Sequence, residues 1–437
     1  MNPWSMPRGL PWLPGIRPLI RFLESAPPLL LAAFVFSLPL SASGKEGAQA
    51  NGVVQPGSGS ATAAVNTTGA DSAPATIQDP SRQTIEEGST AVISVDAGDE
   101  GTTYKWLRNG VPIAGGSEAV LVIRNASSAS EGAYTCVVTS AAGSTVTKET
   151  AIHVVAAPCP GHLTMMSCRT FSGTGPRRLV AGFVVGGPSM SGSIPVLLRA
   201  SGPGLAAKGV ERALPDASIV LRDSEKILGV NRGWGGNKAV AAAAEAVGAA
   251  NWTDDSIGDS ALLRDLPCGG YTAEVFSENG DTGFATAEVF DSRDTSAYTK
   301  GSQRLVNLSV RSPVGKGPNI PVMTFGVGGT TSMTLLIRGM GPALAPFGIP
   351  DTLQEPSLLL YRINGDGTQT WLQSNAKWGG KRYLSEIGNM IGAFPWKSGM
   401  AADATILMTV PPGEYLLILA GANGETGVAL MELYEVP

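Results

Sequence analysis

Histidine, cysteine and charged residues are all scarce in this chain of 437 residues. Two histidines and four cysteines are too few to build several conventional zinc sites. Charged residues make up 15% of the chain, where about 25% is typical, which argues against coiled coils and charge-rich disorder. The net charge of −5 gives no excess of cations to neutralise phosphates, so we expect no nucleic-acid binding and no cofactor.

Glycine (56) and proline (31) are abundant instead. This composition is typical of short strands joined by many turns. The length allows two to four domains, each with a core of its own. The chain is therefore expected to be mostly β.

The N-terminus has the order of a secretory signal peptide. Three arginines within the first 21 residues precede an apolar run, Leu29–Leu38, and small residues up to Ser43 follow. The run is too short for a comfortable membrane span, which needs about 20 residues. We expect residues 1–43 to be removed and the mature chain to be secreted or held at the cell surface with no membrane span. A retained N-terminal membrane anchor is the minority alternative.

Residues 44–75 are rich in Gly, Ala, Ser and Thr and carry no apolar periodicity. Such a segment cannot bury enough surface to offset its ordering entropy. We expect a disordered linker here.

Residues 76–156 alternate short strand-like runs with turn residues, which predicts a two-sheet sandwich. The segment resembles the immunoglobulin-like family at Trp106 and at the run from Gly132 to Cys136. The resemblance implies that Trp106 packs in the core, that Tyr134 forms a corner and that Cys136 bridges to an earlier strand. Val95 occupies the partner position, so we expect Cys136 to remain a buried, reduced thiol.

The remaining sequence is a tandem repeat, with copies at residues 162–292 and 304–437. The matching positions fall in the same order in both copies, and they include Arg199 with Arg338 and Trp234 with Trp378. So many matches in register cannot arise by chance. The chain is therefore expected to hold two copies of one domain.

Each copy reads as strands with one short helix, at Ala239–Ala250 in the first copy and at Tyr383–Ile391 in the second. The predicted fold class is all-β, with an immunoglobulin-like sandwich followed by two tandem jelly-roll-like β-sandwich domains. An up-and-down barrel is the competing architecture for each copy.

The copies also resemble an uncharacterised extracellular β-repeat of exported bacterial proteins. Copy 2 carries its opening at Arg304–Ser309, its middle at Arg338–Ala345 and its close at Gly427–Tyr434. The resemblance implies no known activity. It favours secretion and a modular adhesive or structural role.

The two histidines do not suit a serine hydrolase. His153 lies in the last strand of the immunoglobulin-like segment, where a solvent-facing side chain is the ordinary interpretation. His162 lies at a domain junction, and its counterpart in copy 2 is Arg304. Neither has the surroundings of a general base.

Paired carboxylates are a better enzyme hypothesis, because glycoside hydrolysis uses two of them. Asp254, Asp255 and Asp259 cluster after Trp252, but copy 2 retains only Asp403. A solvated loop or a calcium-holding turn is favoured over a catalytic pair. The turns around Asp281 and Asp366 likewise offer oxygen ligands but lack a full calcium loop. The Gly-Pro turns after Arg199 and Arg338 lack the lysine of a phosphate loop and are expected to be structural.

Arg199 and Arg338 recur before a turn, and Trp234 and Trp378 recur beside paired glycines. The favoured interpretation is structural, with each arginine satisfying buried carbonyls or pairing with the recurring aspartate of its copy, and each tryptophan capping the sandwich. The alternative is that these four residues form a binding surface for a glycan.

Three cysteines remain. Cys168 and Cys268 belong to copy 1 and have no counterparts in copy 2, and Cys159 precedes the repeat. Of the connectivities open to an exported chain, a bridge between Cys159 and Cys168 is the first choice.

The sequence thus predicts an exported, non-catalytic protein with an adhesion, scaffold or binding role, acting on an unknown protein or glycan at the cell surface. A set of glycan-binding modules or an accessory protein of a carbohydrate-active enzyme is the alternative.

Overall fold

The computed structural model describes most of the chain from Thr76 onward, so the predicted signal peptide (1–43) and linker (44–75) lie outside the described residues. The described residues are 76–77, 82–96, 101–141, 143–187, 192–250, 258–294, 298–396 and 402–437. They are mostly β-strands with a few short helices, which confirms the all-β fold class.

The immunoglobulin-like domain is a sandwich of two sheets. The first contains, in order, β1 (Thr76–Ile77), β3 (Ala91–Asp96) and β6 (Val120–Ile123). The second contains, in order, β2 (Arg82–Glu86), β9 (Thr150–Val155), β7 (Gly132–Ser140), β4 (Thr103–Arg108) and β5 (Val111–Pro112). Strand β8 (Gly143–Val146) also pairs with β7, and a 3-10 turn, η1 (Ser128–Ser130), precedes β7 in the chain.

Its core confirms the family features. Trp106 is fully buried and lies opposite Cys136 on the neighbouring strand. The hydroxyl of Tyr134 donates to the Ser130 carbonyl oxygen at 2.6 Å and so forms the expected corner. Cys136 is a free thiol whose pKa is raised by burial, and Val95 packs in the same cluster. Packing of the tryptophan replaces the cross-sheet disulfide of the family.

Each repeat copy contributes two four-stranded sheets that pack face to face. In copy 1 the first sheet contains, in order, β14 (Ile227–Asn231), β13 (Ser218–Arg222), β16 (Gly269–Phe276) and β11 (Leu179–Gly186). The second sheet of copy 1 contains β15 (Ser260–Pro267), β12 (Ser193–Ser201), β17 (Gly283–Asp291) and β10 (His162–Ser172). In copy 2 the first sheet contains, in order, β22 (Gln369–Asn375), β21 (Pro356–Ile363), β24 (Gly413–Gly421) and β19 (Val322–Gly328). The second sheet of copy 2 contains β23 (Ala404–Val410), β20 (Met333–Met340), β25 (Gly427–Val436) and β18 (Arg304–Val314).

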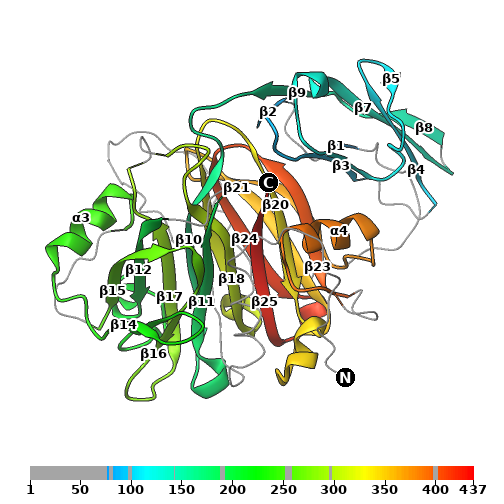
Figure 1. Ribbon diagram of the computed structural model, residues 1–437. Coiled ribbons are helices and arrows are strands. Elements are labelled where there is room, and N and C mark those ends of the chain that lie inside the picture. The colour runs from blue at the N-terminus through cyan, green and yellow to red at the C-terminus, as the bar shows by residue number, and fades with distance from the viewer. Residues whose placement is uncertain are drawn as a thin grey trace, which may run out of the picture.

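The two copies are joined edge to edge. Strand β11 pairs with β18 and β10 pairs with β19, in both cases antiparallel, so two continuous eight-stranded sheets run through both copies. One hydrophobic cluster extends through both halves, and in each half a phenylalanine stacks on a tyrosine, Phe183 on Tyr271 and Phe325 on Tyr415. Pairing removes the open strand edges that each copy would have alone. The copies are therefore joined into one double sandwich (Figure 1).

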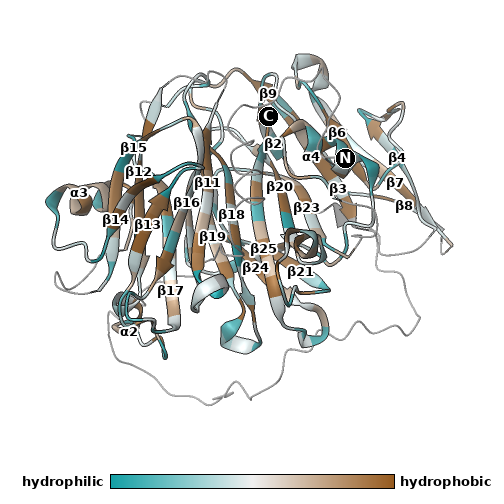
Figure 2. Cartoon of the chain, turned by 60° about the horizontal axis from the view of Figure 1, so that its bottom comes forward, coloured by the Kyte–Doolittle hydropathy of each residue, from teal (hydrophilic) through white to brown (hydrophobic). Residues whose placement is uncertain are grey.

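Each copy contains one longer helix close to the predicted position, and these two helices lie on the outer faces (Figure 1). The longer ones are α3 (Lys238–Ala246) and α4 (Arg382–Met390), and the short ones are α2 (Pro203–Ala206), η2 (Gly175–Arg177), η4 (Gly317–Asn319), η5 (Pro342–Phe347) and η6 (Ala422–Gly424). The side chain of Asn237 caps α3 by accepting from the backbone N–H groups of Ala239 and Val240. Hydrophobic residues run along the strands of both copies (Figure 2), and the immunoglobulin-like domain lies against the outer face of copy 2.

Candidate functional site

The two recurring arginines are buried and do not belong to a surface. Arg199 is 2% exposed and Arg338 0%. The Nη2 atom of Arg199 donates to the Ala250 carbonyl oxygen at 2.8 Å, and Nη1 of Arg338 donates to the Phe394 carbonyl oxygen at 2.8 Å. Satisfying buried carbonyls was one of the two structural roles predicted for them.

Their ion-pair partners are glutamates and not the recurring aspartates. The Nε atom of Arg199 lies 3.1 Å from Oε2 of Glu288, and Nε of Arg338 donates to Oε2 of Glu432 at 2.8 Å. Both pairs join residues directly opposite each other on neighbouring strands. A buried pair of this kind is costly to break, because the remaining charge has no partner.

The recurring aspartates hold the Gly-Pro turns. An oxygen of Asp259 accepts from the Gly202 N–H at 2.8 Å, and an oxygen of Asp403 accepts from the Gly341 N–H at 2.8 Å. A Cβ at Gly341 would lie 1.9 Å from the Leu353 carbonyl oxygen, so the turn requires glycine. Burial raises the pKa of both aspartates to about 6. The contacts of the aspartates give these turns a structural role.

The recurring tryptophans do not form an exposed platform. Trp378 is 7% exposed and stacks on Trp396 with ring centroids 4.5 Å apart, within the cluster that includes Val92 of the immunoglobulin-like domain. Trp234 is partly buried and packs against the cluster under α3. Arg199, Arg338, Trp234 and Trp378 therefore do not form the binding surface that was the alternative prediction.

The predicted disulfide between Cys159 and Cys168 is wrong, because both cysteines are free. Cys168 lies within β10 opposite Ala287 and Met323, whereas the Cys159 carbonyl precedes the strand and accepts from Thr330. A strand rises about 3.3 Å per residue, which separates the two by about 20 Å, and a disulfide needs Cα atoms within about 7 Å.

The other candidate residues make local contacts or lie outside the described residues. Asp254 and Asp255 lie outside the described residues. His153 is exposed and contacts Glu131 at 2.7 Å. Asp366 accepts from the backbone N–H of Thr368 within its own turn, as expected of a plain hairpin. Within the part of the chain that the structure describes, no group of three or more metal-ligating side chains is present.

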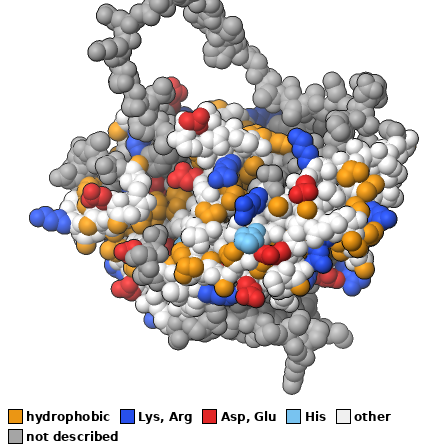
Figure 3. Space-filling model, turned by 90° about the horizontal axis from the view of Figure 1, so that it is seen from above, with side chains coloured by type: hydrophobic (Ala, Val, Ile, Leu, Met, Phe, Trp, Pro, Cys, Tyr) orange, Lys and Arg blue, Asp and Glu red, His pale blue; other side chains and the backbone are white. Residues whose placement is uncertain are grey.

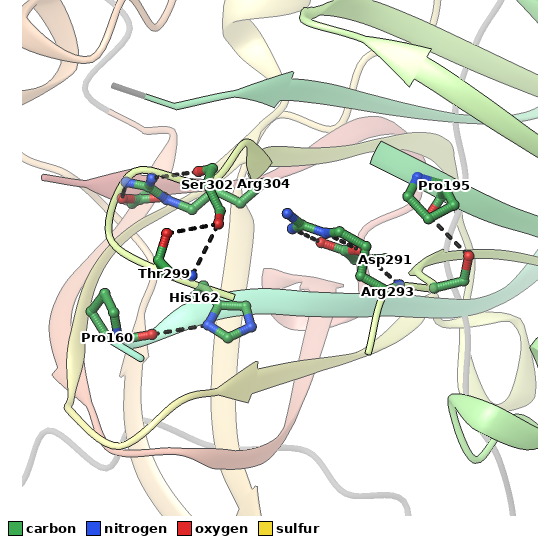
Figure 4. A network of polar contacts seen from close by, with 10 residues as sticks. Pro160, His162, Pro195, Asp291, Arg293, Thr299, Ser302 and Arg304 are labelled. Carbon is green, nitrogen blue, oxygen red and sulfur yellow. Dashed lines mark hydrogen bonds and ion pairs between the residues drawn. The ribbon is translucent and has the colours of Figure 1, made fainter. Parts of the chain in front are cut away.

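A pocket at the junction of the two copies holds a concentration of polar and aromatic groups that the sequence did not single out. It is lined by the start of β10, the end of α3 and the connection that leaves β17. The imidazole of His162 is 3% exposed, and its Nδ1 atom lies 2.9 Å from the Pro160 carbonyl oxygen. Nearby, Nε of Arg293 donates to Oδ1 of Asp291 at 2.9 Å (Figure 4).

One signal for this pocket was present in the sequence. His162 stands where copy 2 has Arg304, and Asp291 stands where copy 2 has Glu435. Arg304 and Glu435 form an ion pair, with Nε donating to Oε2 at 2.7 Å. The departure from the repeat pattern marks the place where copy 1 is built differently.

Comparisons with known proteins bear on the immunoglobulin-like domain. Residues 74–140 match the family "Immunoglobulin domain". Similar solved structures include the N-terminal four Ig domains of Dscam1 isoform 7.44, with 29% identity over 19% of this chain and 20% of that chain and a TM-score of 0.17. Another is Dscam1 isoform 6.9, with 30% identity, 19% and 20% coverage and a TM-score of 0.17. No curated protein matches. The chain spans about a fifth of each of these structures, and the family match establishes an immunoglobulin-like domain here.

Proposed function

We propose that the protein is an exported, non-catalytic adhesion or binding protein of a bacterial cell surface, which presents its immunoglobulin-like domain on the double sandwich. The observation that carries this proposal is the way the domain is attached. Its β1-β3-β6 sheet faces copy 2, where Val92 packs with Leu336 and Trp378. The opposite sheet is therefore directed outward.

Specific hydrogen bonds fix this attachment. The Val92 N–H donates to the Thr409 hydroxyl at 2.7 Å, and the Thr90 hydroxyl donates to the Pro437 carbonyl oxygen at 2.6 Å. Lys300 Nζ lies 3.0 Å from Oε1 of Glu86. An interface that combines apolar packing with buried hydrogen bonds holds a domain in one orientation.

The outward sheet suits a protein partner. Leu107, Thr135 and Val137 point away from the core and are partly exposed, and Val146 beside them is 62% exposed. Centres of protein interfaces are depleted in charged residues. Acidic and basic side chains are interspersed over the described part of the face seen in Figure 3, which fits a protein partner better than a polyelectrolyte.

The described residues contain no helix long and apolar enough to cross a membrane. The signal-like leader favours export, and sequencing the N-terminus of the secreted protein tests cleavage after Ser43.

The adhesion proposal is tested by coating beads with the mature chain, residues 44–437, and measuring their binding to source cells. Thr135→Arg places a charge at the centre of the outward sheet and is expected to abolish binding. Ile227→Glu changes an exposed apolar side chain on β14 of copy 1 and is the matched control. Equal binding by both variants and the unaltered chain would contradict the proposal.

A further inference from the structure

The pocket at the junction of the copies is small and is lined by both apolar and polar side chains. Its volume is about 220 Å³. Sites for drug-sized ligands measure about 300–1,000 Å³, so this pocket suits a single small ring. The apolar lining includes Met165, Val247 and Phe290. The polar lining includes His162, Tyr298 and the Asp291–Arg293 pair, which no part of the function proposed above uses.

The tautomer of His162 follows from its contact. A carbonyl oxygen only accepts hydrogen bonds, so Nδ1 donates to Pro160 and Nε2 of the neutral ring is an acceptor. Burial lowers the pKa of His162, which keeps the ring neutral at pH 7. The ring stacks on Tyr298 with centroids 3.6 Å apart.

The hydroxyl of Tyr298 is the least expected feature. The side chain is 4% exposed, and its oxygen has no hydrogen-bond partner. Other buried tyrosine hydroxyls do have partners; that of Tyr271, for example, donates to the Pro267 carbonyl oxygen at 2.7 Å. A buried hydroxyl without a partner destabilises the folded state and calls for an explanation, such as a bound molecule.

The charges of the pocket disfavour an anion. Asp291 and Arg293 neutralise each other and His162 is neutral, so these lining residues supply no net positive charge to hold an anion. A lining that combines apolar side chains with planar polar groups fits a ring with C–H bonds on its faces and hydroxyls at its rim. A carboxylate beside a guanidinium offers acceptors and donors side by side, as neighbouring hydroxyls require.

We propose that this pocket binds one neutral monosaccharide unit, whose hydroxyls bond to Tyr298, His162 and the Asp291–Arg293 pair. At the corresponding strand ends of copy 2, Arg304 extends to Glu435, and both side chains are longer than their counterparts His162 and Asp291.

The test is ligand-observed NMR on the mature chain with methyl glycosides of neutral hexoses and pentoses and with glucuronate as the acidic comparison. We expect one or more neutral glycosides to bind in the millimolar range and glucuronate to bind more weakly. Tyr298→Phe is expected to weaken binding about fivefold, because one hydrogen bond to the ligand is lost. The same variant should unfold at an unchanged or higher temperature, since the hydroxyl has no partner in the free protein.

Two further variants make the result decisive. His162→Arg introduces the residue of copy 2 and is expected to abolish binding. Tyr271→Phe removes a satisfied hydroxyl far from the pocket, so it should lower the unfolding temperature and leave binding unchanged. Absence of binding by every neutral glycoside, or equal affinity in Tyr298→Phe and the unaltered chain, would overturn the proposal. Bead adhesion through the outward sheet is independent of Tyr298, so the two proposals fail separately.

Discussion

The outer faces of the two copies use equivalent strand positions but are covered differently. In copy 1, Leu197 and Phe290 lie under α3, whose contacts are made by Val240 and small alanines. In copy 2, the equivalent Leu336 and Tyr434 lie under the larger side chains of α4 and under Val92 of the immunoglobulin-like domain. The repeated sheet is thus a common base, and differences in the covering residues decide what can be attached to it.

The largest expected effect concerns the buried arginines. Arg338→Ala should reduce the free energy of unfolding by about 3–5 kcal/mol, because Glu432 then remains buried without its partner. Arg199→Ala should reduce the free energy of unfolding by less. Arg338 additionally lies over the rings of Phe394 and Trp396, and Arg338→Ala removes these contacts as well. Urea denaturation measures both. Arg382→Ala, at an exposed pair, is the control and should cost under about 1 kcal/mol. A larger loss for Arg199→Ala would reverse the comparison.

Replacing each recurring tryptophan should have different effects in the two copies, because their outer faces are covered by different elements. Trp378→Ala is expected to cost about 3–5 kcal/mol and to loosen the immunoglobulin-like domain, because the ring lies in the shared cluster. Trp234→Ala should cost less and leave that domain in place, because it lies under α3. Hydrogen exchange of the β3 amides reports the docking. Equal protection of β3 in both variants would contradict the prediction.

The aspartates should behave alike in both copies. Their folded pKa of about 6 lies above the unfolded value of about 3.9, so the folded state binds these protons more tightly. The stabilisation is complete below the unfolded pKa and is lost as pH rises through about 6, by up to about 3 kcal/mol for each group. Stability measured from about pH 4 to 7 should fall less steeply in Asp259→Asn and Asp403→Asn. An unchanged slope in both variants would argue against buried protonated acids.

The smallest effect concerns one hydroxyl under the attached domain. Thr409→Val removes the acceptor of the Val92 N–H and should cost about 1–3 kcal/mol. Asp265 holds the equivalent position in copy 1 and is exposed, so Asp265→Thr should change stability by less than about 0.5 kcal/mol. The unfolding temperatures of the two variants compare the face of copy 2 under the immunoglobulin-like domain with the equivalent exposed position in copy 1.

Much of the fold followed from the sequence, because repetition doubles the signal. The strands, the two helices and the immunoglobulin-like core were predicted from alternation, turns and matched positions. The joining of the copies through β10 and β11 was missed. Nothing in one copy reveals that its edge strands find partners in the other, since edge pairing uses backbone groups that every residue carries.

The site residues were harder to predict for a related reason. Arg199 and Glu288 are far apart in sequence and meet only through strand register, although both recur in each copy and that joint recurrence was available. The nearby aspartate was the more obvious partner and was the wrong one. The junction pocket depends on where the two copies differ, and a search for shared residues passes over it.

The pairing of β10 with β19 also imposes an order on biosynthesis. Strand β10 emerges from the ribosome long before β19 is made, so the first copy has two open edges until the second arrives. Such long-range pairing is slow to form. The two sheets can close only when both copies are present together, so both edges of copy 1 remain open to other strands while copy 2 is being made.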